Sequence, residues 1–117
     1  MEELKTIDAL YNKMGEYTKM EEELPFPEFQ HFYQSLMDYL MKNYQDMSRD
    51  DLLKAKGMTM IVAANAQLRA TRKDEYRKKF SKMAEKGKFW EDAIVLNLTK
   101  SGMTKDEIDT KVGEMWS

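Results

Sequence analysis

Cysteine is missing from this chain of 117 residues. Its absence excludes disulfide bonds, cysteine-ligated zinc, iron–sulfur clusters and thiol nucleophiles. A chain that makes no use of disulfides has no need of an oxidising compartment, so we expect a cytoplasmic protein.

Residues that interrupt helices are scarce, with only two prolines and five glycines. The glycines are scattered singly, so there is no glycine-rich loop to cradle phosphates. Long hydrophobic runs are lacking too. The longest spans residues 60–64, too short to cross a membrane, and the first residues lack the positive start and apolar run of a signal peptide. We therefore predict no membrane segment and no bound cofactor.

The composition that remains is typical of one folded helical domain. Apolar residues make up 42% and charged residues 34% of the chain, a balance that fits a globular domain with a heavily charged surface. Hydrophobic residues recur three and four positions apart in every apolar segment, which is the period of an amphipathic helix. We predict an all-α fold in which residues 1–117 form a single domain, a compact bundle of five or six helices.

Local signals indicate where the helices begin and end. A first helix over about residues 2–20 is stopped by Pro25 and Pro27, and Pro27 fits the first turn of a second helix that lasts to about residue 44. Ser48 caps a third helix. Residues 48–86 form either one helix or two, because the apolar stripe continues in phase but a turn at residues 71–73 is equally compatible.

Three glycines carry further expectations. Gly57 falls on the apolar face of the third helix and predicts a close helix crossing there. Gly87 is expected to end a helix, after which residues 89–100 form a separate helix, apolar nearly all round and therefore central. Gly102 ends that helix, and a capping box at residues 104–107 begins the last one.

The apolar stripes also predict the core. Met37 and Met41 widen the stripe of the second helix. The buried face of the third helix is expected to consist of Leu53, Met60, Ile61, Ala64 and Leu68. The residues expected to be most deeply buried in the whole chain are Phe32, Leu36, Leu40, Ile61, Ala64, Phe80, Trp90, Ile94 and Leu98.

Groups suited to catalysis or metal binding are few. His31 is the only histidine, and Glu28 is the one carboxylate near it on the same helix face. Two ligands fall short of the three or four that a transition-metal site needs. We predict no metal site, no catalytic residue and no enzymatic activity, with His31 a surface or boundary imidazole. An enzyme that uses carboxylates or tyrosines in a cleft is the weakest of three functional hypotheses.

Charge is distributed unevenly along the chain. The net charge is −2, but residues 1–53 carry −7, residues 54–88 carry +8 and residues 89–117 carry −3. On a continuous helix, five basic side chains would fall within a sector of about 120°. This candidate face for an anionic partner consists of Arg72, Lys78, Lys79, Lys82 and Lys86. The favoured interpretation is that it faces acidic neighbours within the bundle, either the first helix or residues 21–23.

Residues 94–108 resemble the start of a helix-turn-helix, with a glycine turn between two helices. That resemblance implies a following helix that reads a DNA groove, and too few residues remain to supply it. An ordinary helical hairpin is therefore the favoured interpretation.

Eleven methionines are the last unusual feature. Methionine is flexible and polarizable and is over-used on adaptable binding surfaces. Our leading hypothesis is a non-enzymatic protein that acts by protein–protein interaction, as a regulator or adaptor, with self-association included. The alternative is a nucleic-acid-associated protein that uses the basic segment 69–88, although this segment offers no interleaved exposed aromatic residue for base stacking.

Overall fold

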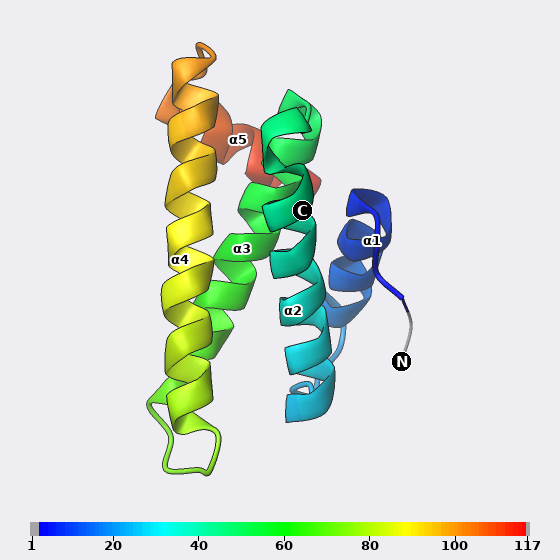
Figure 1. Ribbon diagram of the computed structural model, residues 1–117, viewed down its shortest axis with the longest axis vertical. Helices are drawn as coiled ribbons and strands as arrows, with labels where there is room; N and C mark the ends of the chain where they lie inside the picture. The colour runs from blue at the N-terminus through cyan, green and yellow to red at the C-terminus, as the bar shows by residue number, and fades with distance from the viewer. Residues whose placement is uncertain (1–2, 117) are drawn as a thin grey trace.

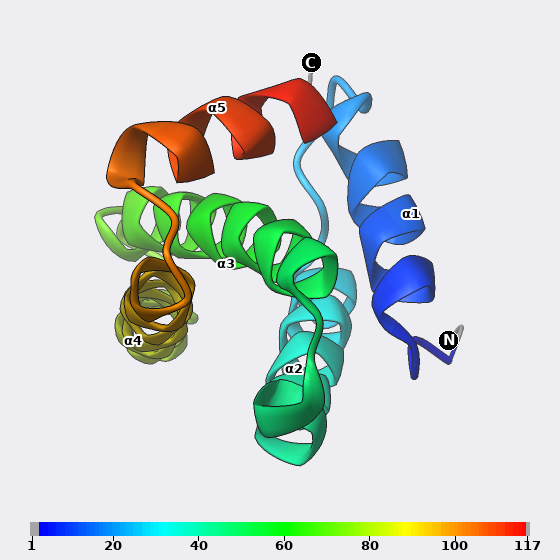
Figure 2. The ribbon, with the colours of Figure 1, turned by 90° about the horizontal axis from the view of Figure 1, so that it is seen from above.

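The computed structural model describes residues 3–116, and within that range it contains five α-helices and no strand (Figures 1 and 2). The helices are α1 (Ile7–Thr18), α2 (Phe26–Asn43), α3 (Arg49–Ala70), α4 (Arg77–Lys100) and α5 (Lys105–Met115), and a short 3-10 helix, Tyr44–Asp46, follows α2. The all-α prediction is confirmed. More than two-thirds of the chain is helical, against about one-third in an average globular protein.

The central element is α3, which contacts α1, α4 and α5 (Figure 2). Its longest shared surface is with α4, which returns beside it in the opposite direction (Figure 1). An ion pair crosses this surface, because the Lys56 Nζ lies 3.1 Å from the Glu91 Oε2 and both side chains are largely buried. No helix within residues 3–116 has the length and apolar character needed to cross a membrane.

Residues 48–86 form two helices rather than one. Ser48 caps α3 as predicted, since its hydroxyl accepts a hydrogen bond from the Asp51 N–H at 3.2 Å. The helix ends at Ala70, and α4 begins only at Arg77. Asp74 organises the turn between them by accepting the Tyr76 N–H at 2.7 Å. Such local side-chain hydrogen bonds compete with a continuous helix, and here they prevail.

Gly87 does not end a helix, and that prediction was wrong. α4 passes through it without interruption, so residues 89–100 are the second half of α4 and not a separate central helix. A Cβ placed on Gly87 would lie 3.1 Å from the Ala63 Cβ and 3.4 Å from the Ala63 Cα. The absence of a side chain therefore lets α3 and α4 approach closely at this point.

Gly57 serves a different purpose from the helix crossing that the sequence predicted. The indole of Trp116 lies directly against it, and a Cβ at Gly57 would collide with the Trp116 Nε1. The Tyr11 hydroxyl donates to the Met115 carbonyl at 2.9 Å, and the Tyr11 and Trp116 rings lie 4.9 Å apart. Gly57 thus makes room for the Trp116 side chain to pack between α1 and α3.

The hairpin between α4 and α5 follows the predicted pattern. Gly102 has a φ of 107°, a conformation that side chains disfavour. This lets the Met103 N–H return to the Leu98 carbonyl at 3.1 Å. The capping box is present, with Thr104 and Glu107 each accepting the backbone N–H of the other. Both features are local, which explains why the sequence predicts them well.

The predicted core is confirmed in part. Six of its members are buried: Phe32, Leu36, Leu40, Phe80, Ile94 and Leu98. Ile61 and Trp90 are only half-buried, and Ala64 is exposed.

The predicted buried face of α3 was largely wrong, since Met60 and Leu68 are also exposed. α3 instead buries small side chains such as Thr59, Ala63 and Ala66. The close approach at Gly87 leaves no space for a longer side chain at Ala63, which lies opposite it.

Three other large apolar side chains are unexpectedly exposed. Met41, predicted to widen the buried stripe of α2, has 69% of its surface accessible. Phe89 and Leu96 on α4 are 63% and 56% exposed. α4 has neighbours on one side only, so an apolar residue on its outer face has nothing to pack against.

Candidate docking pocket and basic ridge

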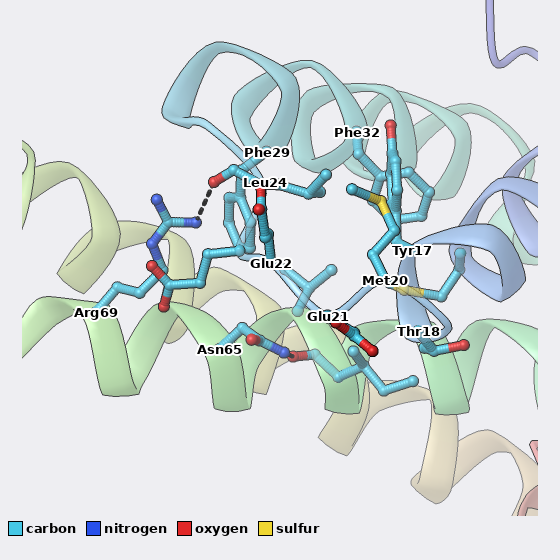
Figure 3. A pocket seen from close by; sticks show the side chains of 14 residues that line it. Tyr17, Thr18, Met20, Glu21, Glu22, Leu24, Phe29, Phe32, Asn65 and Arg69 are labelled. Atoms are coloured by element: carbon cyan, nitrogen blue, oxygen red, sulfur yellow. Dashed lines mark hydrogen bonds between the residues drawn. The ribbon is translucent and has the colours of Figure 1, made fainter.

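A pocket of about 310 Å³ opens where the end of α1, the connection between α1 and α2, the start of α2 and the second half of α3 meet (Figure 3). We call it the docking pocket. Its lining consists of Met14, Tyr17, Thr18, Met20, Glu21, Glu22, Glu23, Leu24, Phe29, Phe32, Ile61, Val62, Asn65 and Arg69.

The docking pocket combines an apolar interior with a polar rim. Met14, Phe29, Phe32 and Val62 are buried members of the core, so one wall of the pocket is the core itself. Glu21, Glu22 and Asn65 are exposed. Figure 3 shows Tyr17 and Met20 close to Phe32 at one end, and Arg69 close to Leu24 at the other.

Two arginines from the basic segment hold the connection that forms the rim. Arg69 Nη1 donates to the Leu24 carbonyl at 2.9 Å, while its guanidinium lies 4.4 Å from the centre of the Phe80 ring. Arg72 Nη1 lies 2.7 Å from the Glu23 Oε1. The hydrogen bond from Arg72 lowers the pKa of Glu23, and the nearby charge of Arg69 acts in the same direction. Of the acidic residues 21–23, Glu23 therefore does meet the basic segment, but only at its first arginines.

The candidate anionic-partner face is divided by the fold. Arg72 lies in the turn after α3, so it does not share a helix with the four lysines. Lys79 leans over the stacked rings of Phe26 and Tyr76, with its Nζ 5.4 Å and 6.0 Å from their centres. The side chains of Lys78, Lys82 and Lys86 are exposed on α4 and form no ion pair with any residue in the range 3–116.

Two exposed apolar side chains follow these lysines along the same helix. Successive residues of an α-helix are turned by about 100°, so positions 78, 82, 86, 89 and 96 share the outer face of α4. We call this surface the basic ridge: Lys78, Lys82, Lys86, Phe89 and Leu96. The basic segment 69–88 itself contains no exposed aromatic residue, but Phe89, the residue directly after it, lies on this face and is mostly exposed.

Neither surface contains the chain's only histidine. His31 is half-buried on α2, and its backbone carbonyl accepts the Ser35 hydroxyl at 2.8 Å. In the described part of the chain, no three histidine, aspartate or glutamate side chains come together as metal ligands would.

The docking pocket was missed by the sequence interpretation. Residues 21–23 look like an acidic helix end in water, and Asn65 looks like an ordinary polar position on a helix. They meet because the chain reverses between α1 and α2 and then lies against the second half of α3. Arg69, Leu24 and Glu23 are brought together by contacts between residues more than forty positions apart, which no local pattern records.

Comparisons with known proteins supply no template for either surface. No protein family, no characterised protein and no solved structure matches the chain. The chemistry of the docking pocket and of the basic ridge is therefore inferred from their own residues.

Proposed function

We propose that the protein acts without catalysis, as a regulator or adaptor that binds another protein chain, and that the docking pocket receives an apolar side chain of the partner. The observation that carries the proposal is the pocket itself, with its apolar interior and acidic rim. A volume of about 310 Å³ is at the lower end of the range for small-molecule sites. It is better suited to one protruding side chain than to a cofactor.

The rim specifies the charge of the partner. Glu23 is already paired with Arg72, but Glu21 and Glu22 are exposed beside the opening. An incoming lysine or arginine would find a carboxylate there, and such complementarity speeds and orients association. The expected partner therefore carries a large apolar side chain next to basic residues.

The electrostatics of the rim support binding rather than acid catalysis. A general acid needs a carboxyl group whose pKa is raised towards neutrality. The pKa of Glu23 is lowered, so this carboxylate stays ionised and bound to Arg72. A cytoplasmic setting is part of the proposal, since the chain contains no cysteine that an oxidising compartment would pair.

The pocket can be tested with peptides displayed on phage. Selection of a random peptide library on the immobilised protein should enrich sequences with an aromatic or large aliphatic residue flanked by lysine or arginine. Replacing Asn65 by tryptophan should abolish their binding, because the indole would cover the opening while Asn65 itself loses only a local hydrogen bond to the Ile61 carbonyl. Isothermal titration with one synthesised peptide measures the loss.

A matched control is available on α2. Met41→Glu changes an exposed residue that does not line the pocket, so it should leave peptide affinity unchanged. Peptides that bind the Asn65→Trp variant as tightly as the original chain would contradict the proposal.

A second candidate function is nucleic-acid binding through the basic ridge. The supporting observation is Phe89, an exposed aromatic residue on the same helix face as three lysines. Lysines that contact phosphates combined with a ring on which a base stacks are the usual elements of single-strand binding.

The ridge lysines allow a direct test of this second function. If they contact phosphates, affinity for a fluorescent single-stranded oligonucleotide should fall steeply with salt, because each contact releases counterions. Replacing Lys78, Lys82 and Lys86 by glutamate should then abolish binding, while Lys105→Glu on α5 should not. Fluorescence anisotropy over a salt series measures both effects. A complex that does not respond to salt or to the triple substitution would refute this function.

A further inference from the structure

We infer that the partner of the docking pocket is the basic ridge of a second copy of this chain, so that molecules associate head to tail. This inference rests on the proposed function, because it names the occupant of the same pocket. Phe89 would enter the pocket of the neighbouring molecule, and Lys82 and Lys86 would face its Glu21 and Glu22.

The ridge has the form of a helix that docks into a groove. Phe89 and Leu96 are seven residues apart, or two helical turns, and both are more than half exposed. That spacing is the usual one for the anchors of a helix bound in an apolar groove. Single exposed apolar residues are common on protein surfaces, but here two lie in line on one face of the same helix.

The lysines are placed to reach the acidic rim when Phe89 is inserted. Lys86 precedes Phe89 by three residues and Lys82 by seven, which correspond to about 4.5 and about 10.5 Å along the helix axis. Both lie on the N-terminal side of the anchor, so they approach one side of the opening together. Glu21 and Glu22 are adjacent in sequence and both line the pocket, with Glu21 towards Thr18 and Met20 and Glu22 towards Leu24 (Figure 3).

The charges within one molecule leave this part of the basic segment unmatched. Arg72 is neutralised by Glu23, and Lys54 pairs with Asp8 at 3.1 Å. Lys78, Lys82 and Lys86 form no ion pair within residues 3–116, and neither do Glu21 and Glu22. One molecule therefore displays both members of a complementary pair on separate surfaces, and a second copy satisfies both.

The arrangement of the helices favours a heterologous contact over a twofold one. α4 and α1 lie on opposite sides of the molecule in both views (Figures 1 and 2). The ridge and the pocket of one molecule therefore cannot meet each other. In a row of molecules, each one inserts its ridge into the pocket of one neighbour and receives the ridge of the other neighbour. If two ridges packed against each other, the lysines of one molecule would face the lysines of the other and repel them. A heterologous contact that does not close produces open chains, and a contact this small should be weak and concentration-dependent.

Complementary variants test the inference. Phe89→Glu destroys the ridge and leaves the pocket intact, whereas Asn65→Trp closes the pocket and leaves the ridge intact. In sedimentation velocity at low ionic strength, the original chain should show a sedimentation coefficient that rises continuously with concentration. Each variant alone should remain a monomer. An equimolar mixture of the two should form a dimer and nothing larger, because only one pair of surfaces is functional.

Controls separate this inference from its alternatives. Met41→Glu should associate like the original chain, and added salt should weaken association. A chain that stays monomeric at millimolar concentration would overturn the inference. A mixture of the two variants that fails to restore association would overturn it too, and so would a ridge that binds only oligonucleotides. Pocket-dependent binding of selected peptides would in that case still support the proposed function, so the two failures are distinguishable.

Discussion

Replacing Phe80 by alanine should lower the free energy of unfolding by about 3–5 kcal/mol, the usual cost of truncating a fully buried phenylalanine. Phe80 has no exposed surface. Its ring meets those of Phe26 and Phe29 edge to face, each at 5.4 Å between centres, and the Arg69 guanidinium covers it at 4.4 Å. The substitution therefore removes buried area and several specific contacts together. Urea unfolding followed by circular dichroism measures the loss.

Phe89 supplies a matched control for Phe80 on the same helix. It is the same residue type in α4, but most of its surface is exposed, so Phe89→Ala should change stability by no more than about 0.5 kcal/mol. Equal losses for the two variants would contradict the assignment of inner and outer faces to α4. Phe80→Ala should also weaken peptide binding in the docking pocket, because Phe80 supports Phe29 and Arg69, which line it.

Ile94→Ala should cost about 2–5 kcal/mol, because Ile94 is fully buried in the second half of α4. α4 packs against α3 and α5, and the Tyr44 hydroxyl donates to the carbonyl of Ala93, the residue before Ile94. The substitution would leave a cavity that rigid, close-packed helices fill only in part. The loss of stability lies nearer the lower value if the neighbouring helices relax into this cavity, and nearer the upper value if they do not. Equilibrium unfolding in urea, with the slope compared to that of the original chain, gives the value.

Leu96 is the corresponding control for Ile94. It lies two residues further along α4 and is 56% exposed, so Leu96→Ala should have an effect of about 0.5 kcal/mol or less. If Ile94→Ala lowered the free energy of unfolding by less than about 1 kcal/mol, this half of α4 would lie at the surface of the protein, which would contradict the burial of Ile94. Because Leu96 belongs to the basic ridge, its variant should still weaken self-association, which separates folding from binding at one position.

Patterns carried by neighbouring residues were sufficient for several helix ends, although not for the end predicted at Gly87 or for the break between α3 and α4. Ser48 and the box formed by Thr104 and Glu107 cap their helices as predicted, and Gly102 ends α4. Pro27 lies in the first turn of α2. Each of these features depends on hydrogen bonds or backbone angles within about four residues, so the local sequence contains all the information needed.

Tertiary structure alone decided which faces of the helices are buried and where the binding surfaces lie. Met41, Leu68 and Phe89 are apolar and periodic, yet no helix covers them. Gly57 and Gly87 are required by Trp116 and Ala63, which approach from distant parts of the chain. An apolar residue is buried only where another segment of the chain packs against it, and a charge is neutralised only where the fold places an opposite charge beside it. The docking pocket and the basic ridge follow from that arrangement, which no local period of the sequence encodes.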